Sequence, residues 1–193
     1  MTGESVPDWL RPPPEGWTAE YLDSLPSDGP RFEMIDGALI MMPPRSAFHD
    51  RVMRRLANAL EDQAPQHADV HTDMTVKLGR RQRPEPDVLV TRPQHEPPDL
   101  LRTYYLPEEV VLVVEIVSPE SEERDRDTKR IKYARAGLQH YWLIENENLQ
   151  PVIHVLELDK ATGVYVATGI YRDRLKVNAP FPIDMDVKAL VRR

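Results

Sequence analysis

The chain contains no cysteine among its 193 residues. It therefore cannot form disulfide bonds, a zinc site built on thiolates or a cysteine nucleophile. Any metal ion must be bound through oxygen or imidazole. This composition fits a reducing compartment, and we expect a cytoplasmic protein.

Long hydrophobic runs are also missing. The longest run, residues 110–117, is far shorter than the roughly 20 residues that span a bilayer, and Glu115 interrupts it. The N-terminus carries Glu4, Asp8 and several prolines in place of the basic and apolar regions of a signal peptide. We therefore expect no membrane association.

The sequence has no overall excess of basic charge. The formal net charge is −7, with 25 Lys and Arg against 32 Asp and Glu. Non-specific binding to nucleic acid gains affinity when basic side chains displace counterions, so this charge argues against a protein that coats nucleic acid. A local basic groove stays compatible with the composition.

The length indicates one domain, because a chain of this size can bury roughly 70% of its unfolded surface around a single core. Residues 1–16 contain the run Pro12-Pro13-Pro14 and no periodic apolar face. They are typical of an extended, flexible leader rich in proline. We expect residues 17–193 to form a single domain.

The first half of the chain alternates helical and extended patterns. Asp36-Gly37 between two apolar stretches is a common signal for a tight hairpin. Apolar residues spaced four apart from Phe48 to Leu60 predict an amphipathic helix. The expected elements are helix 19–25, strands 32–35 and 38–42, helix 46–63, and strands 70–78 and 87–90.

The second half predicts a buried strand followed by a helix and more strands. Residues 110–117 are almost continuously apolar and β-branched, as in a central strand covered on both faces. The expected elements are strand 110–117, helix 125–136, strand 140–145, and a C-terminal hairpin of strands 151–158 and 164–170. The order predicts an α/β domain with a mixed β-sheet flanked by helices and an added N-terminal hairpin.

Two acids fall within the predicted buried strands. Glu115 shares one face of its strand with Val113 and Val117, and Asp87 begins a second buried strand. A buried ionised carboxylate costs several kcal/mol unless it meets a cation, and two neighbouring carboxylates repel unless a cation lies between them. Each acid alone is equally compatible with an ordinary ion pair, but together they favour a divalent-metal site.

A basic helix follows the strand that carries Glu115. Asp125, Lys129 and Tyr133 are spaced four apart and form one stripe on this helix. The order of Pro-Asp, buried Glu and basic helix is the outline of metal-dependent phosphodiesterases of the PD-(D/E)XK class. Their lysine usually lies two residues after the glutamate, where this chain has Val117, so Lys129 is the candidate substitute.

Several motifs in sequence order carry a family resemblance. They are residues 31–37 (RFEMIDG), His49, Pro86-Asp87, residues 114–119 (VEIVSP), Asp125 with Lys129 and Tyr133, and Ala136-Gly137 before Tyr141-Trp142. Their order and spacing from about Trp17 to the C-terminus closely resemble the Uma-two family of endonucleases. The family often has an acid where this chain has Ala38, and commonly an Asp where it has Glu145; neither position falls on the proposed metal site.

The resemblance implies a restriction-endonuclease-like core of the PD-(D/E)XK superfamily. It implies catalytic positions at Asp87, Glu115 and Lys129, with Glu33 and His49 in support. Ser118 follows the metal strand and could contact a phosphate, so we add it, with Asp125 and Tyr133, to the supporting residues. Residues 124–135 hold a local basic concentration, in which we expect nucleic-acid contacts from Arg126, Arg130 and Lys132.

The sequence thus predicts an endonuclease in which Asp87 and Glu115 bind Mg²⁺, with Mn²⁺ as a substitute, to hydrolyse phosphodiester bonds in DNA. We expect a homodimer, because cleavage of both strands commonly uses two symmetric sites. One alternative is a catalytically inactive nuclease fold that binds nucleic acid or a protein partner. A purely structural dimer module would require the two acids to lie far apart or to pair with separate cations.

Overall fold

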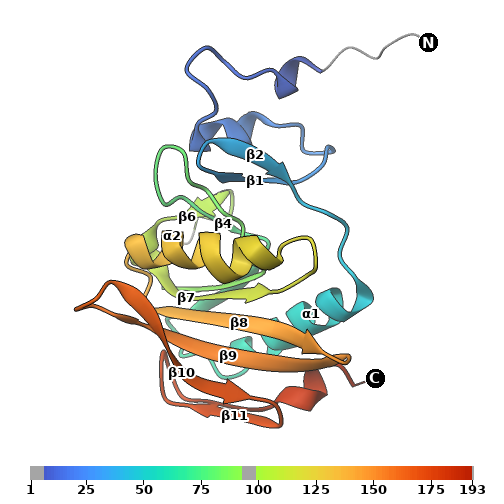
Figure 1. Cartoon of the computed structure of the whole chain (residues 1–193), viewed down its shortest axis with the longest axis vertical. Helices are drawn as coiled ribbons and strands as arrows, with labels where there is room; N and C mark the ends of the chain where they lie inside the picture. The colour runs from blue at the N-terminus through green and yellow to red at the C-terminus, as the bar shows by residue number, and fades with distance from the viewer. Residues whose placement is uncertain (1–6, 93–98, 193) are drawn as a thin grey trace.

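A six-stranded mixed sheet forms the centre of the protein in a computed structural model that describes residues 7–92 and 99–192 (Figure 1). The strand order is β10-β9-β8-β7-β5-β3, with β7 and β8 parallel and the other neighbours antiparallel. The strands are β3 (Asp69–Thr72), β5 (Val88–Thr91), β7 (Val110–Ile116), β8 (His140–Glu147), β9 (Gln150–Asp159) and β10 (Val164–Tyr171).

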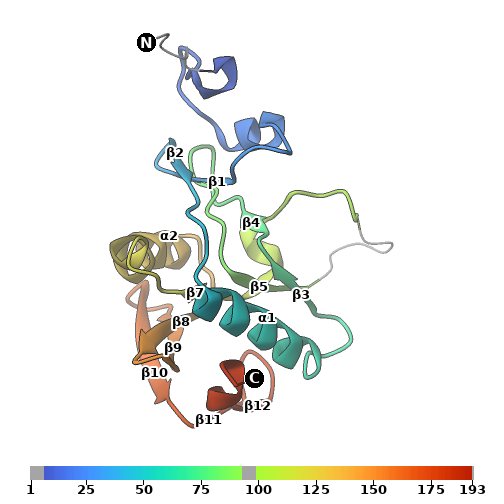
Figure 2. The same ribbon diagram turned by 90° about the vertical axis from the view of Figure 1, so that its right-hand side faces the viewer.

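One face of the sheet is covered by helix α1 (Ala47–Glu61) and by a C-terminal hairpin (Figure 2). The hairpin consists of β11 (Arg174–Val177) and β12 (Ile183–Asp186), followed by the 3-10 helix η5 (Val187–Leu190). Ser46 caps α1 by accepting a hydrogen bond from the backbone N–H of His49. The apolar stripe of α1, which includes Val52, Leu56 and Leu60, packs into the core on this face.

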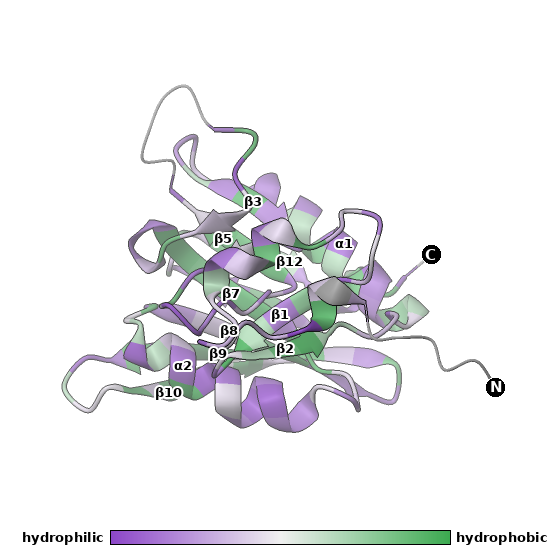
Figure 3. Cartoon of the chain, turned by 90° about the horizontal axis from the view of Figure 1, so that it is seen from above, coloured by the Kyte–Doolittle hydropathy of each residue, from purple (hydrophilic) through white to green (hydrophobic). Residues whose placement is uncertain are grey.

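The opposite face carries the helical connection between the parallel strands β7 and β8. This connection begins as the π-helical segment η4 (Arg124–Lys129) and continues as α2 (Arg130–Arg135). Tyr133 packs there in a cluster with Tyr141 and Tyr165. In the view from above, hydrophilic residues mark the outer side of this connection, while hydrophobic ones concentrate in the strands (Figure 3).

An N-terminal layer lies at one end of the sheet (Figures 1 and 2). It comprises η1 (Asp8–Leu10), η2 (Ala19–Ser24) and the hairpin of β1 (Phe32–Ile35) and β2 (Ala38–Met41). The small parallel sheet of β4 (Thr75–Val76) and β6 (Tyr104–Tyr105), with η3 (Pro107–Glu109), joins it to the core. In the expected leader, Trp9 contacts the Phe32 ring; residues 1–6 of the leader lie outside the described residues.

The structure confirms the predicted α/β class and mixed sheet but corrects several elements. Predicted strand 70–78 breaks at Asp73, whose φ of 61° redirects the chain, so β3 and β4 join different sheets. The predicted hairpin of residues 151–170 is confirmed as β9 and β10 at one edge of the central sheet. The hairpin β11–β12 was not predicted, and helix 125–136 begins with a π-helical turn.

A buried arginine anchors the N-terminal layer to the core. The guanidinium of Arg83, 2% exposed, donates two hydrogen bonds to Asp23, of 2.7 and 2.9 Å, and further ones to Ala19, Thr75 and Thr103. The bond from Arg83 is the main cause that lowers the pKa of the Asp23 carboxyl below its ordinary value. A largely buried ion pair therefore joins these segments.

Replacing Asp23 by Asn should destabilise the protein at neutral pH by about 1 kcal/mol, a value reduced for the partial exposure of Asp23. Because the folded-state pKa is depressed, this stability is present above the pKa of the unfolded state and is lost as the pH falls. Urea unfolding at neutral and acidic pH should show the difference from wild type shrinking in acid. Asp28→Asn, an exposed position nearby, serves as the control; an equal loss at both pH values would contradict the assignment.

Candidate active site

Asp87 and Glu115 lie opposite each other on neighbouring strands. In the antiparallel pair β5–β7, Val88 pairs with Val114, so the preceding Asp87 faces the following Glu115. The two residues are only 6% and 2% exposed, and both line an open cavity of about 1210 Å³. The backbone N–H of Ile116 donates a hydrogen bond of 2.7 Å to Asp87 Oδ2. The sheet register, not a loop, therefore sets the spacing of the two acids.

Lys129 reaches this pair from the helical connection on the same face. Its Nζ lies 3.1 Å from Glu115 Oε2 and 3.0 Å from Glu33 Oε2, with Asp125 Oδ1 at 3.5 Å. Tyr133 donates a hydrogen bond of 2.7 Å to the other oxygen of Glu115. Lys129 is 1% exposed. One ammonium thus sits among three buried carboxylates.

Burial and crowding shift the protonation of this cluster. Burial raises the pKa of Glu115 well above its ordinary value, and the nearby carboxylates of Asp125, Asp87 and Glu33 add to the rise. Burial also raises the pKa of Asp125. For Lys129, burial opposes the charged form, but the surrounding carboxylates outweigh it and raise its pKa well above normal. The lysine is therefore charged, and Glu33, Glu115 and Asp125 share it as a partner.

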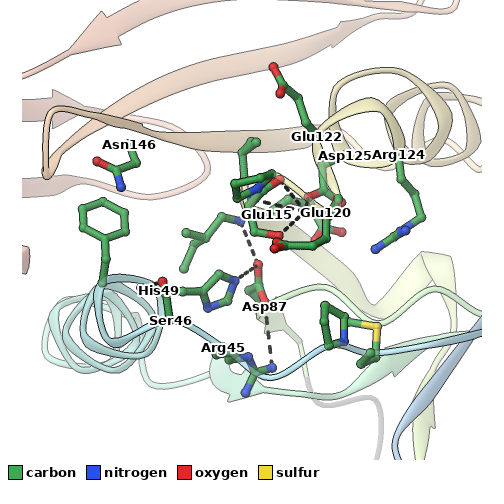
Figure 4. A pocket seen from close by; sticks show the side chains of 18 of the residues that line it. Arg45, Ser46, His49, Asp87, Glu115, Glu120, Glu122, Arg124, Asp125 and Asn146 are labelled. Atoms are coloured by element: carbon green, nitrogen blue, oxygen red, sulfur yellow. Dashed lines mark hydrogen bonds and ion pairs between the residues drawn. The ribbon is translucent and has the colours of Figure 1, made fainter.

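Asp87 has a different environment from Glu115. Burial opposes its ionisation, but the hydrogen bond and charge of His49, together with the Ile116 N–H, outweigh burial and lower the pKa of Asp87. His49 Nε2 lies 3.2 Å from Asp87 Oδ2, and Arg45 Nη2 lies 3.9 Å from Asp87 Oδ1 (Figure 4). Asp87 is thus held as a carboxylate with one oxygen directed toward Arg45.

The structure brings most of the residues predicted from sequence to one place. Asp87, Glu115 and Lys129 line the cavity together with His49, Ser118, Asp125 and Arg126. Ser118 and Asp125 are linked through Ser121, whose Oγ lies 3.1 Å from Ser118 Oγ and donates a hydrogen bond to Asp125. Glu33 and Tyr133 do not line the cavity themselves. Glu33 contacts Lys129, and Tyr133 donates a hydrogen bond to Glu115.

Two of the residues predicted to contact nucleic acid, Arg130 and Lys132, lie outside the cavity. Arg130 donates a hydrogen bond of 2.9 Å to the backbone oxygen of Tyr165, and Lys132 pairs with Asp36. Neither lines the cavity, whereas Arg126 does, where it pairs with Glu145 at 2.6 Å. A run of basic residues on a helix points in several directions, so sequence proximity alone could not select among them.

Three arginines that were not among the predicted site residues also line the cavity. Arg124 lies 2.7 Å from Glu33 Oε1, and Arg31 and Arg45 both contact Asp73. Arg31 also pairs with Glu85, whose pKa burial raises to about 7. Arg31 and Arg45 stand in loops outside any periodic pattern. Only the folded chain shows that these residues converge.

The oxygen donors at the centre fit a hard divalent cation. Mg²⁺ is commonly bound through one or two carboxylates and keeps several waters, and Asp87 and Glu115 supply that number. Asp125 Oδ1 is also buried at the cavity, 3.5 Å from Lys129 Nζ. Within residues 7–92 and 99–192 there is no group of three or more acidic or imidazole side chains arranged to hold a metal.

Strand order, the crossover helix and the acids at the β5–β7 pair define a restriction-endonuclease-like fold. A crystal structure described as that of a "putative nuclease belonging to DUF820 from Anabaena variabilis" superposes with a TM-score of 0.71, at 18% identity over 90% of this chain and 97% of that chain. At this identity the likeness shows the fold. No curated protein matches the sequence.

The profile of the Uma2 family, described as "Putative restriction endonuclease", matches residues 18–188. The chain belongs to this family, which confirms the resemblance noted from the sequence motifs. No described helix is long and apolar enough to cross a membrane.

Proposed function

We propose that the protein is a metal-dependent endonuclease that hydrolyses phosphodiester bonds in DNA by means of a metal-activated water. The observation that carries the proposal is that the buried carboxylates of Asp87 and Glu115 line one cavity, with the Lys129 ammonium 3.1 Å from Glu115. Membership of a family described as restriction endonucleases supports the same reaction class. Asp87 and Glu115 would hold the cation, which when bound polarises the phosphate and lowers the pKa of an attacking water.

The protein's own residues then have distinct tasks. Lys129 keeps its positive charge beside Glu115 and stabilises negative charge that develops on the reacting phosphate. Glu33, Asp125 and Tyr133 hold the lysine and the Glu115 carboxylate in place. His49 fixes the orientation of Asp87 and favours its ionised form. In this scheme Lys129, from the helical connection, replaces the strand lysine that is usual two residues after the glutamate, where this chain has Val117.

The proposal is tested with purified full-length protein and supercoiled plasmid. Mg²⁺ or Mn²⁺ should convert the plasmid to nicked and linear forms, and EDTA should stop the reaction, because the two carboxylates act only with the cation bound. A matched RNA substrate measures the preference for DNA, and light scattering during size-exclusion chromatography measures the expected dimer. Cleavage that is unaffected by EDTA, or no cleavage with either ion, would contradict the proposal.

A second candidate is an inactive nuclease fold that binds nucleic acid or a protein partner. The observation that favours it is that Lys129 and Tyr133 already engage the two oxygens of Glu115. Electron paramagnetic resonance of free Mn²⁺ separates the two candidates. Retention of Mn²⁺ by the wild-type protein, lost on Asp87→Asn, supports the enzyme; a folded protein that leaves all Mn²⁺ free supports the inactive module.

A further inference from the structure

Arg45 has its backbone fixed from both sides. Pro43 and Pro44 precede it and restrict φ on that side, while Ser46 follows as the N-cap of the 15-residue helix α1. The segment is therefore stiff although it lies between β2 and α1. An arginine on such a segment loses less conformational freedom when it binds a ligand than one on an open loop.

Asp73 holds the Arg45 side chain in a forked pair. Arg45 Nη1 donates a hydrogen bond of 3.0 Å to Asp73 Oδ2, while Nη2 donates to Oδ1. Asp73 adopts a φ of 61°, which is uncommon for a residue with a side chain. The turn that ends β3 thus places this carboxylate under the guanidinium. Arg31 Nη2 lies 3.1 Å from the same Oδ1 atom.

The two arginines meet at the cavity wall next to Asp87. Both line the cavity, and Arg45 Nη2 comes within 3.9 Å of Asp87 Oδ1 (Figure 4). The two guanidiniums share one Asp73 oxygen, and Arg31 also pairs with Glu85. The first turn of α1 lines the same wall, and the amino-terminal end of a helix favours anions. This wall thus presents two guanidiniums beside Asp87.

We propose that Arg45, held by Asp73 and flanked by Arg31, forms an anion subsite that binds a phosphodiester group of the nucleic-acid strand beside Asp87. The inference rests on the proposed function and adds to it the residues that receive the substrate backbone. A guanidinium fork matches two phosphate oxygens, and the edge of Arg45 not used by Asp73 supplies further N–H donors. Arg45 is a binding residue in this scheme and takes no part in bond breaking.

The test is binding of fluorescent oligonucleotides by the full chain in EDTA, measured by anisotropy over a range of salt concentrations. Arg45→Gln should weaken binding about tenfold and reduce the salt slope by about one, because one phosphate contact is lost. Arg45→Lys should keep the slope but lose affinity, because an ammonium lacks the fork. Arg174→Gln, which removes an exposed guanidinium outside the cavity, is the matched control and should bind as wild type.

Several outcomes would overturn the subsite. The first is that the wild-type protein binds no oligonucleotide, and the second is that Arg45→Gln has the affinity and salt dependence of wild type. The third is that Arg45→Gln loses affinity only for strands with a 5′-phosphate, which would indicate a site for a terminal phosphate. Arg45-dependent binding without any cleavage in Mg²⁺ or Mn²⁺ would support the subsite while contradicting the nuclease. Melting temperatures of each variant, with Asp73→Asn included, separate ligand binding from a structural role, since a structural role alone leaves the salt slope unchanged.

Discussion

Cleavage by the Glu115→Gln protein should be at least about 10³-fold slower than by wild type, which corresponds to about 4 kcal/mol of lost transition-state stabilisation. Glutamine keeps the shape of the side chain and an oxygen for the Tyr133 hydroxyl, but it lacks the charge that holds a cation. Lys129 keeps its contacts with Glu33 and Asp125, so the fold should persist. Asp87→Asn should have an effect of the same size, because Asp87 is the other buried carboxylate of the same cavity and the second proposed metal ligand.

The measurement is the initial rate of plasmid nicking in Mg²⁺, with folding checked by circular dichroism. Glu147→Gln is the matched control, because Glu147 lies near the end of β8 in an exposed pair with Arg172, outside the cavity. This control should cleave at the wild-type rate. Equal activity in all four proteins would mean that the activity comes from a contaminant or from another site.

Replacing Lys129 by Met should impair both activity and folding. The change leaves Glu33, Glu115 and Asp125 buried without their shared cation, and breaking a buried ion pair in this way costs about 3–5 kcal/mol. The rate of cleavage should fall by about 10²–10³-fold, because the charge beside the reacting phosphate is lost. Urea unfolding and plasmid nicking measure the two effects on the same protein.

The pH dependence identifies the cause of the instability. In the Lys129→Met protein, Glu115 and Asp125 lose their cation while burial still raises the pKa of each above its ordinary value, so protonation stabilises the folded state. The loss of stability should therefore be largest at alkaline pH and should shrink as the pH falls to about 5. Lys132→Met, on the same helix but in a partly exposed pair with Asp36, should change stability by less than about 1 kcal/mol. Equal losses for the two variants would contradict a special role of the buried lysine.

Local patterns predicted the elements that depend on a single periodicity. The four-residue spacing along α1 and the apolar run of β7 each predict an element that the structure contains. The strand that breaks at Asp73 shows the limit of this approach. Alternation continues through residues 70–78, but a left-handed turn at Asp73 moves its second part into another sheet. At this turn the Asp73 side chain contacts Arg45 and Arg31, which lie far away in the sequence.

The sequence by itself determined that Asp87 and Glu115 would be buried acids in need of a cation, because each is embedded in an apolar strand. It also indicated Lys129 as the amine, from the stripe of Asp125, Lys129 and Tyr133. Only the tertiary structure decided that the register of β5 and β7 sets the two acids face to face and that Lys129 lies among three carboxylates. The tertiary structure also placed Arg45 in the cavity beside Asp87, and Arg130 and Lys132 outside it. Strand pairing and loop positions are set by contacts distant in sequence, which no local pattern contains.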